Sequence, residues 1–98
     1  MAYYRKSKVI REGPLDIASS LKDLLRYWRL SKDRIETIGD ITRHSTGDAS
    51  EAEAEIKNKA EQNKADGLCI RKFPYKTKGD PDQHYCVYGV MYQIKQEA

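Results

Sequence analysis

The chain has 98 residues, of which 39% are hydrophobic and 34% are charged, and its net charge is +3. This length predicts a single domain over residues 1–98, and the apolar content is enough to build a core, so the composition excludes a globally disordered chain. No segment approaches the roughly 18 apolar residues that cross a bilayer, and the N-terminus lacks the apolar stretch of a signal peptide. We therefore expect a cytoplasmic protein that has no membrane partner.

Residues 1–14 are expected to form a basic arm or a short strand. Residues 1–34 contain nine Lys and Arg against four Asp and Glu, and tyrosines lie among the first basic residues. Such a surface can hold nucleic acid, because cations bind phosphates and rings stack on bases. A solvated chain terminus can have the same composition. The candidate binding residues are Tyr3, Tyr4, Arg5, Lys6, Lys8 and Arg11, together with Arg26 and Arg29 from the helix that follows.

An amphipathic helix is predicted over about 15–30, as the main part of a helical segment 15–34. Pro14 precedes it and suits the first turn, where the missing N–H does no harm. Apolar residues then recur at spacings of three and four, which is typical of one buried helix face. They are Ile17, Ala18, Leu21, Leu24, Leu25 and Trp28. In a domain this small, we expect that stripe to be core.

A strand is predicted over 35–43, which is rich in Ile and Thr, and a loop is predicted over 44–48. Residues 35–66 contain four Lys and Arg against eight Asp and Glu, so the molecule is expected to have surfaces of opposite charge. Such surfaces suit docking on a charged partner, and they are equally a common solubility pattern.

A second helix is predicted over about 50–65. Ser50 and Glu53 match a capping box at its start, and Gly67 stands where a C-terminal cap is expected. A narrow stripe of small apolar residues would let the helix lie close on a sheet; its members are Ala49, Ala52, Ile56 and Ala60. Ion pairs at the i,i+4 spacing are expected along the exposed side, namely Glu53–Lys57 and Glu55–Lys59.

The last third predicts a β-hairpin, because two strand-like runs, 67–76 and 84–95, flank the turn-forming residues KGDPD. Centring the turn near Asp80 places Tyr75 opposite Tyr85. One face then carries Leu68, Ile70, Cys86, Tyr88, Val90, Tyr92 and Ile94. The order predicts an α+β fold: an N-terminal amphipathic helix, then a β-α-β-β unit over 35–95 whose antiparallel hairpin forms a small sheet.

Cys69 and Cys86 are the only cysteines. In this register they lie on opposite faces, too far apart for a disulfide, which needs Cα atoms within about 7 Å. His84 and Cys86 share a face, but a structural zinc needs four ligands and His44 is distant in the sequence. We expect two free thiols, no metal, no cofactor and no catalytic residue, and therefore no enzyme.

The stretches "ETIGDIT", "NKAEQNKADGLCI" and "YGVMYQIK" resemble the YhcN-like (BhsA/McbA-like) family of small enterobacterial stress and biofilm proteins. The resemblance covers residues 35–95, about two thirds of the chain. It implies one helix packed on a small antiparallel sheet and a role in the stress response. The family supplies no catalytic residue to carry over.

Tyrosine serves both cores and interfaces, because its ring is apolar and its tip is polar, and the chain contains seven. If one face of the hairpin is thinly covered, it is a docking surface, and we assign Tyr75 and Tyr85 to it. We therefore interpret the chain as a non-enzymatic protein-interaction module, a regulator or inhibitor of a larger complex, of the kind that phages make against host enzymes. One alternative is a nucleic-acid-binding accessory protein that binds weakly through the basic N-terminal region. The other is a stress-response protein of the resembled family.

Overall fold

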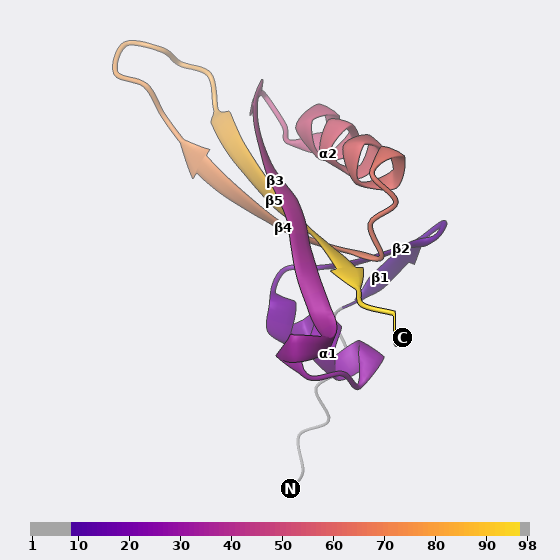
Figure 1. The fold of residues 1–98 in the computed structure, drawn as a ribbon. Helices are drawn as coiled ribbons and strands as arrows, with labels where there is room; N and C mark the ends of the chain where they lie inside the picture. Colours follow the sequence, from indigo (N-terminus) through magenta and orange to yellow (C-terminus); the bar gives the residue numbers. More distant parts are fainter. Residues whose placement is uncertain (1–8, 97–98) are drawn as a thin grey trace, which may run out of the picture.

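Residues 9–96 are described by the computed structural model (Figure 1). Their elements are β1 (Ile10–Glu12), β2 (Leu15–Ala18), α1 (Leu21–Trp28), a short 3-10 helix (Lys32–Arg34), β3 (Ile35–Thr46), α2 (Ser50–Gln62), β4 (Gly67–Tyr75) and β5 (His84–Ile94). The strands of this part of the chain form one five-stranded sheet in the order β1-β2-β4-β5-β3. β2 runs parallel to β4 and the other neighbours are antiparallel. The predicted α+β class is confirmed, but two strands precede the first helix.

The segment predicted to begin the first helix is a strand instead. β1 and β2 form a small hairpin, and its turn contains Gly13, at φ 59°, and Pro14. β2 is buried at every position, and it lies between β1 and β4. Its apolar residues Ile17 and Ala18 fit the helical spacing, but the stretch pairs in parallel with Gly67–Cys69 and is a strand. The predicted start at residue 15 was therefore wrong, and α1 begins at Leu21.

Both ends of α1 are capped. The Ser20 hydroxyl accepts a hydrogen bond from the Asp23 N–H at 3.3 Å, and Arg29 ends the helix in the left-handed conformation. Leu24 is fully buried, and Leu21 and Trp28 pack against the same small cluster. The prediction that this stripe is core is confirmed for these helical residues.

β3 confirms the predicted strand and extends it through part of the expected loop to Thr46. α2 begins at Ser50, but the predicted capping box does not form. The Asp48 carboxylate instead accepts hydrogen bonds from the Ser50 amide, at 2.9 Å, and from the Ser50 hydroxyl, at 2.6 Å. These bonds lower the pKa of Asp48, the hydroxyl bond contributing most. The helix ends at Gln62, earlier than predicted.

α2 packs through the predicted stripe of small residues, since Ala52, Ile56 and Ala60 are buried. Its carboxylates do not form the expected intrahelical pairs. Glu53 Oε1 lies 2.9 Å from Lys72 Nζ on β4, and Glu55 Oε2 lies 3.2 Å from Arg43 Nε on β3. The helix lies close enough to the sheet for strand cations to reach these carboxylates. Each exposed pair contributes about 0–1 kcal/mol.

Gly67 was predicted to cap the C-terminus of α2, but it does not. The chain leaves the helix through Lys64, at φ 56°, and Gly67 is the first residue of β4. A Cβ at Gly67 would lie 2.3 Å from Cη2 of Trp28, so the packed indole requires glycine there. The same indole donates Nε1–H to the buried Asp16 carboxylate at 2.8 Å, which ties α1 to β2.

The C-terminal hairpin forms as predicted, but its register differs by one residue. Tyr75 lies opposite His84 rather than Tyr85. His84 is held in the strand because it also pairs with Thr46 of β3, and its Nε2 lies 2.7 Å from Asp80 Oδ2 in the loop. Since side chains alternate along a strand, a shift of one residue exchanges the two faces.

The two faces of the sheet are therefore composed differently from the prediction. The closed face packs against α2 and is formed by Leu15, Ile17, Ile41, Leu68, Val87 and Met91. Gly89 lies among them, where a Cβ would be 2.6 Å from Cγ2 of Ile56. The opposite side, here called the open face, carries Arg71, Phe73, Tyr75, Cys86, Tyr88 and Val90. The predicted register placed Leu68 and Ile70 on the same face as Tyr88 and Val90, but in the structure the two pairs lie on opposite faces.

Candidate functional site

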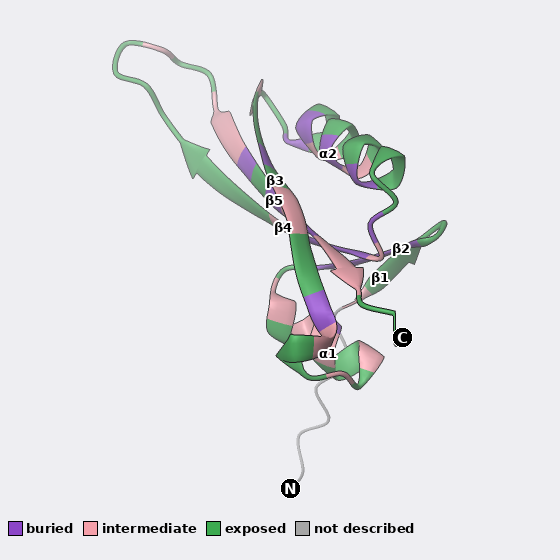
Figure 2. Ribbon diagram, viewed as in Figure 1, coloured by how far each residue is buried: buried purple, intermediate pink, exposed green. Residues whose placement is uncertain are grey.

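The open face is the least covered part of the sheet. Phe73 is 50% exposed, Tyr75 is 40% exposed and Tyr88 is 36% exposed. Figure 2 shows the outer half of β4 as exposed and the loop beyond it as mostly exposed. Arg71 lies directly opposite Tyr88, with Phe73 on the diagonal, so these side chains are neighbours on one surface. Exposed aromatic side chains that gather on one surface typically mark an interaction site.

This face is open because the chain leaves the sheet after Ala18. β2 pairs with β4 only over Gly67–Cys69, the first residues of β4, and the chain then turns through Ser19 and Ser20 into α1 (Figure 1). α1 covers this end of the sheet, where Cys69 and Tyr92 belong to its cluster. Among the described residues, no second helix covers the part of the face that lies beyond it.

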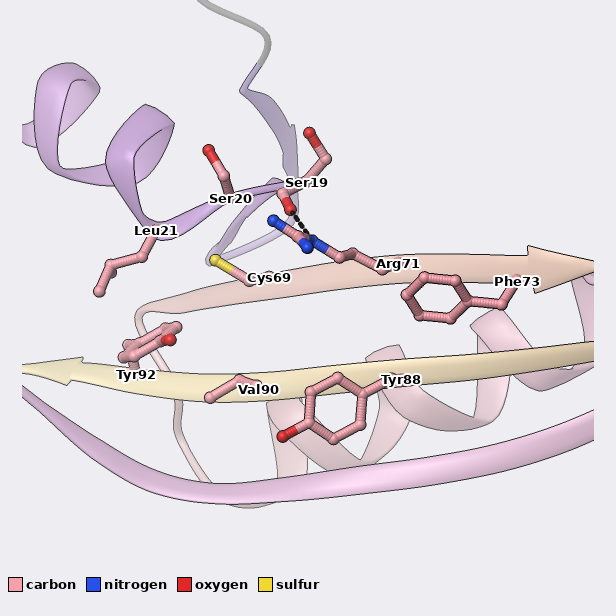
Figure 3. A pocket seen from close by; sticks show the side chains of 9 residues that line it. All are labelled: Ser19, Ser20, Leu21, Cys69, Arg71, Phe73, Tyr88, Val90 and Tyr92. Carbon is pink, nitrogen blue, oxygen red and sulfur yellow. Dashed lines mark hydrogen bonds between the residues drawn. The ribbon is translucent and has the colours of Figure 1, made fainter.

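A pocket of about 410 Å³ lies between the start of α1 and the strands β4 and β5 (Figure 3). It is lined by Ser19, Ser20, Leu21, Cys69, Arg71, Phe73, Tyr88, Val90 and Tyr92. Figure 3 shows Phe73 and Tyr88 at one end and Leu21 and Tyr92 at the other. Mostly apolar walls with a few polar groups are typical of pockets that bind a ligand or a partner's side chain.

Arg71 is the charged side chain of this pocket. Its Nε–H donates to the Ser19 carbonyl at 3.0 Å, which ties β4 to the chain that leaves β2. Among the described residues, no carboxylate forms an ion pair with its guanidinium. The terminal amino groups of Arg71 are therefore available to an anion, and their planar fork matches a carboxylate.

Two phenols at the pocket are held neutral. The Tyr88 hydroxyl donates to Asp40 Oδ2 of β3 at 3.1 Å, and this bond raises the pKa of Tyr88. Burial raises the pKa of Tyr92. Both rings thus remain uncharged at physiological pH and present apolar surface to the pocket.

A polar cluster closes the far end of the open face. The ring of Tyr75 stacks on His84, with centroids 5.4 Å apart, and the Tyr75 hydroxyl lies 3.3 Å from Nδ1 of His44. The pKa of Asp80 is lowered, first by the Asp82 amide and then by His84. Tyr75 is therefore engaged within the protein, which distinguishes it from Phe73.

Both cysteines are free thiols, as predicted. They share the open face, contrary to the predicted register, but Cys69 lies opposite Val90 and Cys86 lies opposite Phe73. At a rise of about 3.3 Å per residue they are roughly 13 Å apart, beyond the reach of a disulfide. Burial raises the pKa of Cys69 to about 12, so its thiol is a poor nucleophile. Within residues 9–96, no three His, Cys, Asp or Glu side chains form a group suited to a metal ion.

The sequence-predicted binding residues do not form one site. Tyr3, Tyr4, Arg5, Lys6 and Lys8 lie outside the described residues. Arg11 is on β1, where its guanidinium lies 3.4 Å from Oδ1 of Asp16, so it already has an acidic partner. Arg26 and Arg29 are exposed at the C-terminal end of α1, whereas the pocket adjoins the N-terminal end.

Tyr75 lies on the open face as expected, but Tyr85 lies on the other side and packs against the α2 cluster. Tyr85 therefore does not share the open face with Tyr75, because the register differs by one residue from the predicted one. Arg71, Phe73 and Tyr88 were missed for the same reason. The i,i+2 spacing of Arg71, Phe73 and Tyr75 was the signal in the sequence that could have found this face.

No family model matches the chain, and no curated protein and no solved structure matches it. The resemblance of residues 35–95 to the YhcN-like family therefore stays a prediction. Within residues 9–96, neither α-helix is long and apolar enough to cross a membrane.

Proposed function

We propose that the chain is a non-enzymatic interaction module, a regulator or inhibitor of a larger protein complex, that docks through the open face of its sheet. The observation that carries the proposal is the exposure of Phe73 and Tyr88 on neighbouring strands, beside an apolar pocket. Aromatic side chains buried against a partner supply a large share of the energy of protein interfaces. Of the two strands that carry these rings, β5 is paired on both sides, with β4 and with β3.

The charges on this face favour a protein partner over nucleic acid. Arg71 is a cation at the pocket, and Asp40 is a carboxylate beside Tyr88. Binding along a phosphate backbone needs several cations, because each neutralised phosphate contributes to affinity. One guanidinium next to one carboxylate gives little attraction for such a polyanion.

Single-stranded nucleic acid is a second candidate, which the exposed rings favour because bases stack on aromatic side chains of open sheets. Its test is a titration of labelled single- and double-stranded oligonucleotides at low and physiological salt. We expect weak binding that is lost as salt rises. Tight binding that survives physiological salt would replace the protein-partner proposal. Its loss in an Arg5/Lys6/Lys8/Arg11→Ala variant would assign the binding to the basic N-terminal region, and its loss in a Phe73→Thr/Tyr88→Thr variant would assign it to the open face.

The protein-partner proposal is tested by cross-linked capture from native lysate, with mass spectrometry. The wild type is compared with a Phe73→Thr/Tyr88→Thr variant, in which threonine keeps the strand propensity. Tyr27→Gln is the matched control, since Tyr27 is an aromatic residue of α1 that is 44% exposed. We expect one partner to be retained by the wild type and the control and lost by the double variant. Equal retention by all three would overturn the assignment of the open face.

A further inference from the structure

The pocket at the start of α1 allows the docking surface to be described more closely, and the inference rests on the function proposed above. We propose that this pocket receives an aromatic side chain from the partner, and that an Asp or Glu next to that side chain binds Arg71. The partner segment is thus a short stretch of protein with one ring and one carboxylate.

The shape and lining of the pocket favour a ring. Leu21 and Tyr92 form the end of the pocket next to α1, Phe73 and Tyr88 form the opposite end, and Val90 lies between Tyr92 and Tyr88 (Figure 3). A volume of about 410 Å³ is more than one aromatic side chain fills. Interface residues that contribute most to affinity are enriched in Trp and Tyr, and they sit in desolvated pockets of this kind.

Arg71 fixes the charge of the occupant. Its Nε–H is bound to the Ser19 carbonyl, so the guanidinium is oriented before a partner arrives. Because Nε is already used, the two terminal nitrogens remain for a carboxylate, which they can bind through two parallel hydrogen bonds. A pre-oriented side chain loses less conformational entropy on binding.

The neighbouring carboxylates limit the occupant to about one negative charge. Asp40 lies beside Tyr88, and the field of Asp23 reaches the Cys69 thiol, where it opposes that of Arg71. Arg71 is also the one cation among the residues that line the pocket, so a second anionic group would have no cation to bind there. A run of phosphates therefore fits this site worse than a peptide with a single Asp or Glu.

The test uses four short acetylated and amidated peptides in a Gly/Ser background, added to the full isotope-labelled chain and followed by amide chemical shifts. They contain Trp–Asp, Trp–Asn, Trp–Lys or Ala–Asp. We expect the Trp–Asp peptide to shift the amides of Leu21, Cys69 and Val90. The Trp–Asn peptide should bind about three- to tenfold more weakly, and the Trp–Lys and Ala–Asp peptides more weakly still.

Two variants test whether Arg71 is the residue that binds the carboxylate of the peptide. Arg71→Gln should bind the Trp–Asp and Trp–Asn peptides equally, while its spectrum remains that of a folded protein. Arg43→Gln is the matched control, because Arg43 is also an exposed strand arginine but lies on the closed side, beside Glu55. It should keep the preference of the wild type for Trp–Asp.

Several results would overturn the inference. They are the absence of shifts with millimolar Trp–Asp peptide, equal affinity for Trp–Asp and Ala–Asp, or an unchanged preference in Arg71→Gln. Shifts of the same amides on raising protein concentration alone would assign the pocket to a second copy, and stronger shifts with a single-stranded oligonucleotide would assign it to nucleic acid. If the peptides fail but capture of the partner still depends on Phe73 and Tyr88, the proposed function stands and only this inference falls.

Discussion

The two faces of the sheet are covered by helices that differ in length and in side-chain size. On the closed face, α2 lies close to the strands because Ala52, Ala60 and Gly89 leave room for its backbone and for Ile56. On the open face, α1 spans only Leu21–Trp28 and packs at one end of the sheet. Where a helix covers the strands, the residues beneath it are buried or partly buried. Where the sheet extends beyond its helix, large rings such as Phe73 stay exposed.

This comparison implies a division of roles. Burial on the closed face contributes most of the stabilisation, since apolar area removed from water stabilises by about 25 cal/mol per Å². The exposed part of the open face contributes little to stability and is therefore available for binding. The predictions that follow test this division, beginning with the largest effect.

Ile56→Ala should lower the free energy of unfolding by about 2–5 kcal/mol, because it leaves a cavity at the centre of the closed face. Ile56 is fully buried and touches the surface of Gly89. Chemical denaturation followed by circular dichroism measures the change. Asn58→Ala, at an exposed position of the same helix, is the control and should stay within about 0.5 kcal/mol. A loss under about 1 kcal/mol at Ile56, below the range typical of such substitutions at buried sites, would mean that α2 is not the main cover of the sheet.

Trp28→Phe tests the part of the open face that α1 does cover. It removes the donor to the buried Asp16, whose carboxylate keeps only the longer contact to Arg11. A hydrogen bond to a buried charged group contributes about 1.5–3 kcal/mol, and we expect a loss of that size. Tyr27→Phe, at the exposed neighbour, should change stability by less than about 0.5 kcal/mol. Equal effects of the two substitutions would show that the indole N–H does not hold α1 to β2.

The two thiols sharpen the same contrast, since Cys69 lies under α1 and Cys86 lies on the open face. At pH 8, iodoacetamide should modify Cys86 about tenfold or more faster than Cys69, because the thiolate is the reactive form. Peptide mapping by mass spectrometry gives both rates in one sample. Similar rates would mean that α1 opens readily from the sheet.

The raised pKa of Cys69 also predicts that the stability of the protein depends on pH. Burial raises the pKa of Cys69 from its ordinary value of 9.0 to about 12. The stability that its protonated form contributes is therefore complete below pH 9.0 and is lost as the pH rises from 9.0 toward 12. Cys69→Ala should unfold with a weaker dependence on pH in that range, and an unchanged dependence would contradict the assigned burial.

The local pattern of the sequence predicted the elements that depend on neighbouring residues. The Ile and Thr run of β3, the small-residue stripe of α2 and the turn residues of the β4–β5 hairpin each indicated the correct element. These signals are periodicity and turn chemistry, which are local by nature.

The remaining features depend on contacts that are distant in the sequence. β2 is a strand because it pairs in parallel with Gly67–Cys69, and the sequence around Leu15 contains no signal that indicates this pairing. The hairpin loop 76–83 is too long for its residues to specify the register as a two-residue turn would. His84 belongs to β5 because it pairs with Thr46 of β3. This pairing between distant residues fixes the register of the hairpin, and the register places Phe73 and Tyr88 on the open face.

The smallest expected effect is at Phe73. Half of its surface is exposed, and the substitution Phe73→Thr keeps a residue that favours strands, so stability should change by no more than about 0.5 kcal/mol. The measurement is the same denaturation experiment that is used for Ile56→Ala. If Phe73→Thr instead costs as much as Ile56→Ala, Phe73 is part of the core, and the division between a stabilising face and a binding face fails. If stability is kept and partner capture is lost, the exposed ring of Phe73 serves binding and not folding.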